Sequence, residues 1–211
     1  MTDKSSLPVL NLDQLRIGVL ALQGSFQEHL AVLDKIGVEG VEIRLPEQIQ
    51  DIHGMIIPGG ESTAIGKLLV DYQLLEPLRN FGKEKPIWGT CAGAILLSRD
   101  AHRKQPLLEL MNITVDRNAF GRQIASFETS LDIPVLDGIS PGSTKFHGIF
   151  IRAPLIDSLS GNAVALSTLP DGKIVAAQEN HLLATAFHPE LTDDDRFHRY
   201  FLRQVQENKN N

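Results

Sequence analysis

Cysteine is nearly absent from this 211-residue chain, which contains one, Cys91. A single cysteine excludes an intramolecular disulfide framework and any site built from several thiolates, such as a Cys-rich zinc or iron–sulfur centre. Cys91 is therefore either a thiol buried for packing or a reactive thiol, and its sequence surroundings must decide between them. A lone thiol without a partner favours a reducing compartment, so we expect a cytoplasmic protein.

Clustered positive charge and long apolar runs are also missing. The chain has 20 Lys and Arg against 26 Asp and Glu, a formal net charge of -6, and no basic run offsets that balance. This argues against nucleic acid or an anionic membrane surface as the main partner, because both require clustered positive charge. No apolar stretch approaches the ~20 residues of a membrane-spanning helix. Residues 1–15 are polar and mixed, unlike a signal peptide, and we expect them to form a disordered extension.

Short apolar runs followed by helical patterns recur through the first half of the chain. The expected strands are residues 16–22, 41–43, 55–57 and 86–88, and the expected helices begin near Phe26, Ser62 and Ala94. Strands that are apolar throughout, rather than alternating, are typical of parallel sheets buried on both faces. The first half therefore predicts repeated strand–helix units around a parallel sheet.

The second half has shorter strand-like segments separated by turn-rich pieces. They are residues 113–115, 124–127, 146–151, 173–177 and 182–187. Hairpins are expected here, extending or flanking the sheet. A final helix is expected at 193–208, with Phe197, Tyr200, Phe201 and Val205 on one side. We predict one α/β domain over residues 16–207, a three-layer sandwich with a mostly parallel central sheet, helices on both faces and added β-hairpins.

The segment Gly89-Thr90-Cys91-Ala92-Gly93 places the thiol between the end of a predicted strand and the start of a predicted helix. Glycines two positions away on either side give the spacing of a nucleophile elbow, with Cys in place of Ser. The N-terminus of the following helix favours the thiolate, which is the nucleophilic form. Alone, the pattern also fits a structural cysteine in a strand–helix turn.

The segment Phe187-His188-Pro189-Glu190 supplies a base and a carboxylate. Pro189 disfavours a helical conformation at His188, and in an extended chain residues two apart point the same way. Glu190 is thus expected to orient the His188 imidazole as the third member of a triad does. His188 would reach Cys91 if the strand ending near Phe187 lies beside the strand before Cys91. The alternative is a surface turn.

Residues 58–63, Pro-Gly-Gly-Glu-Ser-Thr, form a second strand-to-helix turn whose backbone N–H groups are placed to hold an oxyanion. A phosphate-binding P-loop is excluded by spacing, because five residues rather than four separate Gly60 from Gly66, and Leu68 stands where Ser or Thr is required. The structural alternative is a plain helix start with Ser62 as the N-cap.

Other histidines compete with His188 for the role of base. His147 precedes an apolar strand and His181 lies in a polar turn, positions typical of surface or loop residues. His29 lies in the first predicted helix near Gln23, where it is placed to support a partner interface or an active-site loop.

Taken together, six segments resemble one family, the glutaminase subunits of pyridoxal 5′-phosphate synthase within the class I, or triad, glutamine amidotransferases. They are residues 21–24 (ALQG), 58–63 (PGGEST), 89–93 (GTCAG), 117–123 (RNAFGRQ), 150–154 (FIRAP) and 187–192 (FHPELT). The cysteine elbow and the His-Pro-Glu segment are shared across the class and cannot choose among its members, whereas the other four segments are much more specific. The resemblance spans Arg16 to about Phe201.

The resemblance implies a set of site residues. It implies a triad of Cys91, His188 and Glu190, and an oxyanion hole made by the backbone N–H groups of Gly60 and Ala92. It also implies a glutamine site lined by Gly60, Glu61, Ser62, Arg117, Ile151 and Arg152. The chemistry of the substrate agrees, since a guanidinium at Arg117 or Arg152 suits the α-carboxylate of L-glutamine.

The resemblance further implies hydrolysis of L-glutamine through a cysteine thioester and delivery of ammonia to a (β/α)₈-barrel synthase subunit in a large hetero-oligomer, for pyridoxal 5′-phosphate (vitamin B6) biosynthesis. No metal or organic cofactor is expected. Two other hypotheses are a glutaminase subunit serving another acceptor, disfavoured by residues 117–123 and 150–154, and a catalytically silent scaffold of the synthase, disfavoured by the intact triad. Two departures from the family pattern, the basic and polar residues 100–105 and the long N-terminal extension, touch no motif.

Overall fold

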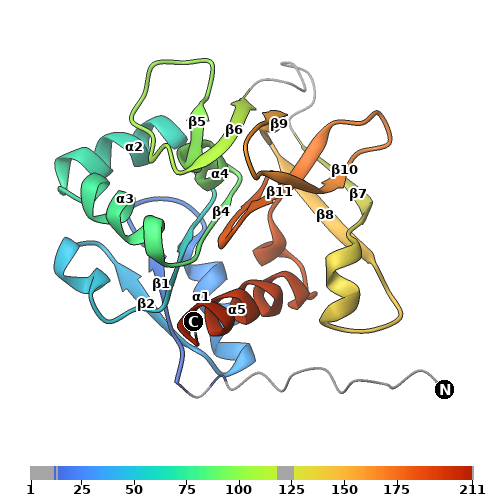
Figure 1. Ribbon diagram of the computed structural model, residues 1–211, viewed down its shortest axis with the longest axis horizontal. Coiled ribbons are helices and arrows are strands. Elements are labelled where there is room, and N and C mark those ends of the chain that lie inside the picture. Colours follow the sequence, from blue (N-terminus) through green and yellow to red (C-terminus); the bar gives the residue numbers. More distant parts are fainter. Residues whose placement is uncertain (1–11, 13, 118–125, 211) are drawn as a thin grey trace.

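The computed structural model describes residues 12, 14–117 and 126–210, and Figure 1 shows how they are arranged. The strands are β1 (Arg16–Leu20), β2 (Glu39–Ile43), β3 (Gly54–Ile57), β4 (Ile87–Thr90), β5 (Ser98–Asp100), β6 (Met111–Asp116), β7 (Ser126–Asp132), β8 (Lys145–Ile151), β9 (Leu155–Leu159), β10 (Val164–Thr168), β11 (Ile174–Glu179) and β12 (Leu182–Thr185). The α-helices are α1 (Phe26–Ile36), α2 (Ser62–Asp71), α3 (Leu75–Glu84), α4 (Ala92–Leu97) and α5 (Arg196–Lys209). Short 3₁₀ helices are η1 (Pro46–Ile49), η2 (Pro134–Gly138) and η3 (Pro189–Leu191).

The main sheet of the described chain has the strand order β2-β1-β3-β4-β12-β11-β9-β6-β5, with β10 paired to β11. The strands from β2 to β12 along this path are parallel to their neighbours. Beyond β12 the pairings to β11, β9 and β6 are antiparallel. A separate antiparallel ribbon joins β7 to β8. The predicted parallel sheet with added hairpins is confirmed.

Helices cover both faces of the sheet, as predicted (Figure 1). On one face, apolar residues of α2, α3 and α4 pack in a core with Met55 and Ile57 of β3. On the other face, α1 and α5 pack in a second core with Ile56, which lies between Met55 and Ile57 in β3. Successive residues of a strand point to opposite faces, so an apolar run such as β3 supplies both cores at once.

Several elements lie where the patterns do not indicate them. Helix α3 contains Pro77 and Gly82, which weaken its helical pattern, although Leu78 and Phe81 are buried in the core. Strands β9 (LIDSL) and β10 (VALST) carry polar residues that hide a strand pattern. These two strands belong to the sheet because they pair with strands distant in the sequence, and local β-propensity does not predict such pairing.

Leu15, the last residue of the predicted extension, is buried in the second core, and its backbone N–H donates to the carbonyl oxygen of Leu12. Most of the predicted extension, residues 1–11 and 13, lies outside the described residues. So do residues 118–125, which include most of the predicted 117–123 motif and the start of the expected 124–127 strand. Among the described residues, no helix is long and apolar enough to cross a membrane.

Candidate active site

Cys91 occupies a sharp turn between β4 and α4. Its backbone has φ 48° and ψ −103°, a strained conformation for a residue with a side chain. The neighbouring glycines allow the turn by close backbone approach: a Cβ on Gly93 would lie 2.0 Å from the carbonyl oxygen of Ile57, and one on Gly89 would lie 2.4 Å from the carbonyl of Gly93. The predicted nucleophile elbow is therefore present, and both glycines are required by packing.

Strand β12 lies beside β4. This is the strand pairing that His188 needs in order to reach Cys91. Thr185 is in register with Thr90, and the backbone N–H of Cys91 donates to the carbonyl of Thr185 at 2.8 Å. The chain leaving β12 then reaches His188, whose backbone N–H donates to the carbonyl of Ile149 in β8. Two parallel strands thus bring the thiol and the imidazole to one edge of the sheet.

His188 and Glu190 form a buried pair. The Nδ1 atom of His188 lies 2.7 Å from Oε1 of Glu190, and the two residues are only 7% and 5% exposed. Pro189 lies between them at the start of η3. The prediction that these two side chains share one face is confirmed, and the surface-turn alternative is wrong.

Glu190 is held as a carboxylate. Burial raises its pKa, but the nearby imidazoles of His29 and His188 and the hydroxyl of Ser25 outweigh that effect and lower the pKa to about 2. Ser25, just before α1, donates to Oε1 at 2.7 Å, so this oxygen has two partners. An ionised carboxylate on Nδ1 fixes the imidazole tautomer and supports a positive charge on the ring.

The same environment favours a protonated His188. Burial lowers its pKa, but hydrogen bonding and charge from Cys91 and Glu190 prevail and raise the pKa to about 10. An imidazolium beside the sulfur stabilises a thiolate, the form that attacks a carbonyl carbon. Hydrogen bonding and charge thus outweigh burial and favour an imidazolium at His188, beside Cys91.

The loop after β3 packs directly over this pair. A Cβ on Gly59 would lie 2.4 Å from Cε1 of His188 and 3.3 Å from Cβ of Cys91. The turn after β1 clamps the loop from the other side, since the backbone N–H of Ser25 donates to Gly59 and the side chain of Gln23 accepts from the backbone N–H of Glu61 at 2.8 Å. Two glycine-containing turns thus bring the predicted oxyanion loop beside the thiol.

Glu61 and Arg117 are joined at this site. Nη2 of Arg117 lies 2.7 Å from Oε1 of Glu61, and Nη1 donates to Thr63 and to Gln105. Glu61 also accepts from the backbone N–H groups of Thr63 and Ala64, which makes Glu61 the N-cap of α2. The alternative that Ser62 is the N-cap is wrong, because Ser62 is the first helical residue and is buried.

Ile151 ends β8, and Arg152 follows it. The carbonyl of Ile151 is 4.0 Å from Sγ of Cys91, and Ile151 is 41% exposed. Arg152 has a positive φ of 45°, which turns the chain away after the strand. The structure therefore brings the predicted residues of the first half, together with Ile151, His188 and Glu190, to one edge of the sheet. Arg152 follows Ile151 directly and is exposed.

Sequence patterns alone do not identify the residues that support Glu190. They indicate Ser25 only as part of a turn and His198 only as part of the last helix. They place His29 as support for an active-site loop or a partner interface, and it instead lies with Nε2 3.5 Å from Oε2 of Glu190. The one feature that points to this role of His29 is its position on the buried face of α1, which faces the edge of the sheet.

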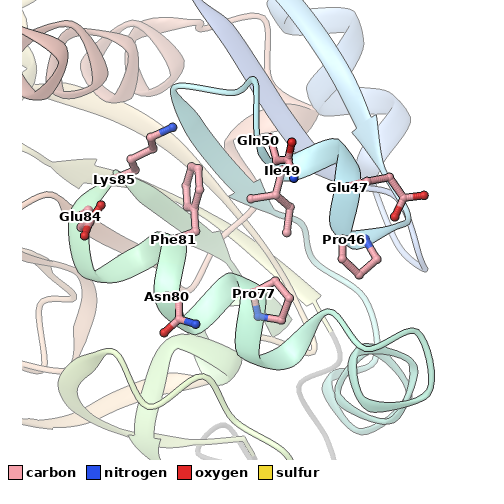
Figure 2. A pocket seen from close by; sticks show the side chains of 9 residues that line it. All are labelled: Pro46, Glu47, Ile49, Gln50, Pro77, Asn80, Phe81, Glu84 and Lys85. Carbon is pink, nitrogen blue, oxygen red and sulfur yellow. The ribbon is translucent and has the colours of Figure 1, made fainter.

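A cavity of about 680 Å³ lies elsewhere, between η1 and α3 (Figure 2). Pro46 and Ile49 form one wall, and Pro77 and Phe81 form the other. None of the residues that line it belongs to the predicted site. Within the described ranges, no group of three or more His, Cys, Asp or Glu is arranged to hold a metal ion.

Comparison with known proteins identifies the family of this chain. A family model described as the SNO glutamine amidotransferase family matches residues 19–207. The chain is 55% identical to a protein of Moorella thermoacetica named pyridoxal 5′-phosphate synthase subunit PdxT, over 90% of this chain and 100% of that one. It is 53% identical to a protein of the same name from Chloroflexus aurantiacus, over 89% of this chain and 99% of that one.

Solved structures agree with the fold. A crystal structure titled glutamine amidotransferase has a TM-score of 0.83 and 43% identity, and the match covers 90% of this chain and 98% of that one. A putative GMP synthase subunit from Thermoplasma acidophilum has a TM-score of 0.68 at 16% identity, covering 93% of this chain and 96% of that one. The second likeness concerns the fold alone.

Proposed function

The chain belongs to the SNO glutamine amidotransferase family, and from that premise we propose that Cys91, His188 and Glu190 are the catalytic residues of its glutaminase reaction. The observation that carries this assignment is the register of β4 with β12, which sets the elbow thiol beside a buried His188–Glu190 pair. The amidotransferase family and the relatives' name, pyridoxal 5′-phosphate synthase subunit PdxT, together support a glutaminase subunit of that synthase.

The reaction begins with attack of the Cys91 thiolate on the side-chain amide carbon of L-glutamine. The carbonyl oxygen becomes an oxyanion, and the backbone N–H groups of Gly60 and Ala92 stabilise it. The close packing of Gly59 against His188 and Cys91 supports this role for the loop. Collapse of the tetrahedral intermediate forms the Cys91 thioester and breaks the carbon–nitrogen bond.

His188 supplies the proton that the leaving amide nitrogen takes up as ammonia. The neutral imidazole then removes a proton from water, which attacks the thioester, releases L-glutamate and restores the thiolate with a protonated His188. Glu190 stays ionised through both steps and stabilises the imidazolium. Its low pKa of about 2 suits that role.

The glutamine site comprises Gly60, Glu61, Ser62, Arg117, Ile151 and Arg152. Arg117 and Arg152 supply positive charge for the α-carboxylate of glutamine. The ion pair of Arg117 with Glu61 and the N-cap bonds of Glu61 fix the first turn of α2 beside the Gly60 loop. This network positions the amide of the substrate over Cys91.

Ammonia released into bulk water is protonated and diluted, so the reaction is useful only beside an enzyme that consumes it. That enzyme is the synthase subunit, which is a (β/α)₈ barrel, and we propose a large hetero-oligomer with one glutaminase on each synthase. We place the complex in the cytoplasm, where the single thiol stays reduced. No metal or organic cofactor takes part in the steps assigned to this chain.

The test reconstitutes the chain with its synthase subunit and supplies glutamine, ribose 5-phosphate and glyceraldehyde 3-phosphate. The absorbance of pyridoxal 5′-phosphate reports the product. Replacing Cys91 by Ala is expected to abolish glutamine-dependent synthesis and to leave ammonium-dependent synthesis unchanged. Unchanged glutamine-dependent synthesis in that variant would overturn the triad assignment. Ammonia transfer to a different amidotransferase acceptor instead of this synthase would overturn the partner assignment.

A further inference from the structure

A buried chain of imidazoles continues from the triad carboxylate into the core. His29 of α1 lies with Nε2 3.5 Å from Oε2 of Glu190 and with Nδ1 3.0 Å from Nε2 of His198 in α5. Both histidines are fully buried, and each ring meets the indole of Trp88 edge-on. The reaction steps assigned above use neither histidine, so their polar atoms in an apolar core require another explanation.

Oε2 is the oxygen of Glu190 that the triad leaves unsatisfied. Oε1 accepts from Ser25 and from His188, each at 2.7 Å. Oε2 is buried and accepts no hydrogen bond from the described residues, and Nε2 of His29 faces it. Hydrogen bonds around catalytic groups are often long without substrate and shorten when it binds.

The charge of Glu190 decides the tautomer of His29. If Nδ1 carried the proton, the lone pair of Nε2 would face an ionised carboxylate and repel it. The proton therefore lies on Nε2, where it faces Glu190 and the hydroxyl of Thr90 at 3.2 Å. Nδ1 then accepts from the Nε2–H of His198. This leaves Nδ1 of His198 without a proton, in agreement with its lack of a hydrogen-bond partner among the described residues.

We propose that His29 is a positioning residue for glutamine hydrolysis: its Nε2–H holds Oε2 of Glu190, and His198 fixes the tautomer of His29 that makes this contact. The proposal rests on the triad assigned above. With both oxygens held, the carboxylate keeps one orientation and presents Oε1 to His188 throughout the reaction. His29 touches neither substrate nor sulfur and acts through Glu190 alone.

Electrostatics agree with a neutral His29. Burial lowers its pKa, the charge of Glu190 raises it, His188 lowers it and Glu28 on the same helix raises it, with a net lowering. Burial and the neighbouring His29 lower the pKa of His198 still further, against a smaller raising effect of Glu190. A neutral imidazole donates one proton to the carboxylate without cancelling its charge, so Glu190 still supports an imidazolium at His188.

The test uses two amide side chains, each of which copies one edge of the imidazole. The amide nitrogen of Gln matches Nε2 in distance from the backbone, whereas that of Asn matches Nδ1. His29→Gln keeps a donor toward Glu190, His29→Asn keeps only the side that faces His198, and His29→Leu fills the volume without either. His147→Leu, which removes an exposed histidine paired with Glu128, is the matched control.

Glutamate release is measured over pH in the complex with the synthase subunit. His29→Asn and His29→Leu are expected to lower kcat about 10- to 100-fold with the KM for glutamine changed less than about twofold, as for loss of a partner that orients a catalytic ligand. The pH range over which His29→Asn and His29→Leu are active is expected to narrow. Without the donor, Glu190 becomes protonated at higher pH and then no longer stabilises the positive charge of His188. His29→Gln and His147→Leu keep the wild-type kcat to within about threefold and the wild-type profile.

Equal activity of the Gln, Asn and Leu variants would overturn the proposal, since volume alone would then explain His29. A second measurement needs no variant at this site. In the wild-type chain labelled with ¹⁵N-histidine, His29 is expected to show the Nε2–H tautomer and to remain neutral from pH 6 to 8; an Nδ1–H tautomer would overturn the proposal. Activity that survives Cys91→Ser would instead refute the triad, so the two failures are distinguishable.

Discussion

The backbone N–H of Cys91 donates to the carbonyl of Thr185 at 2.8 Å. This bond continues the pairing of β4 with β12 one residue beyond Thr90, to the residue that carries the thiol. The position of His188, a few residues after Thr185, is thereby fixed relative to the sulfur by the sheet itself. A site built on paired strands is more precise than one on free loops, because the strands cannot move independently.

Gly93→Ala is expected to destabilise the chain and inactivate it. A Cβ at this position would lie 2.0 Å from the carbonyl oxygen of Ile57, a backbone atom that cannot rotate away. Overpacking of this kind costs typically about 1–3 kcal/mol, and a clash with backbone lies at the upper end. Chemical denaturation measures the change in unfolding free energy, and glutaminase activity measures the displacement of Cys91.

Gly138→Ala is the control for that substitution. The Cβ there would meet only the guanidinium of Arg203 at 3.0 Å, the mobile end of a flexible side chain. We expect a loss below about 0.5 kcal/mol, typical of surface changes, and wild-type activity. Equal destabilisation by the two variants would contradict the packing argument for Gly93.

Gly59→Ala is expected to impair catalysis more than stability. Its Cβ would lie 2.4 Å from Cε1 of His188, so the ring must turn out of line with Cys91 and Glu190. Misplacement of a catalytic group by about 1 Å costs on the order of a hundredfold in rate. Steady-state kinetics in the synthase complex is expected to show a lower kcat, with a melting temperature close to wild type. A variant with normal kcat would show that the loop yields instead of the ring.

The local chemistry of this site was predictable from sequence, because each turn carries its own signals. The glycines around Cys91 mark an elbow, and Pro189 sets the relation of His188 to Glu190. The residues that support the triad were not predictable, since the contact of His29 with Glu190 depends on how α1 packs over the sheet. The same holds for the N-cap of α2, where a long-range contact with Arg117 favours Glu61 over Ser62.

The fold likewise divides into elements that local sequence patterns predict and elements that depend on tertiary packing. The parallel strands and their helices follow from short apolar runs, whose period reports burial directly. The sequence patterns do not predict helix α3 or strands β9 and β10, because Pro77 and Gly82 weaken the helical pattern and polar residues hide the strand patterns. These elements are stabilised by tertiary packing and strand pairing that override weak propensity.

A double-mutant cycle on Glu61 and Arg117 is expected to show weak coupling in stability and strong coupling in substrate affinity. The pair is 2.7 Å apart, but the Glu61 side chain is 52% exposed, and exposed pairs contribute about 0.2–1 kcal/mol. Glu61→Ala also removes the N-cap of α2, which costs about 1 kcal/mol by itself. Urea unfolding gives the stability terms, and the KM for glutamine in the complex gives the affinity terms.

Two single variants in that comparison separate the roles of the pair: Glu61→Gln tests the N-cap, and Arg117→Ala tests the glutamine site. The amide oxygen of the introduced glutamine can still accept from the first turn of α2, so Glu61→Gln is expected to keep most of the stability and lose the ion pair. A KM that is unchanged in Arg117→Ala would contradict the assignment of Arg117 to the glutamine site. Equal stability losses in Glu61→Ala and Glu61→Gln would contradict the N-cap role.

Stability is expected to fall as pH drops from 6.5 to 5, through His29 and His198. Both have folded-state pKa values lowered by burial, whereas in the unfolded chain they titrate near 6.5. Below pH 6.5 the unfolded chain takes up protons that the folded chain refuses, so each histidine contributes a loss of up to about 1.4 kcal/mol per pH unit. His188, whose pKa is raised to about 10, contributes stability that is fully present below pH 6.5 and is lost only as the pH rises toward 10. Glu190, whose pKa is lowered to about 2, begins to matter only below its unfolded value near 4.5.

The measurement is the unfolding free energy from urea titrations at several pH values between 5 and 8. His198→Phe keeps an aromatic ring in the same core. Below pH 6.5 the variant is expected to take up one proton fewer on unfolding than the wild type, so the unfolding free energy of the wild type minus that of the variant falls by up to about 1.4 kcal/mol per pH unit as the pH drops. Burial and nearby Lys209 and Lys85 also lower the pKa of His53, but His53 is present in both chains, so its contribution cancels in the difference. Parallel curves for the two proteins over this range would show that His198 takes up a proton in the folded state, and the buried neutral pair would have to be abandoned.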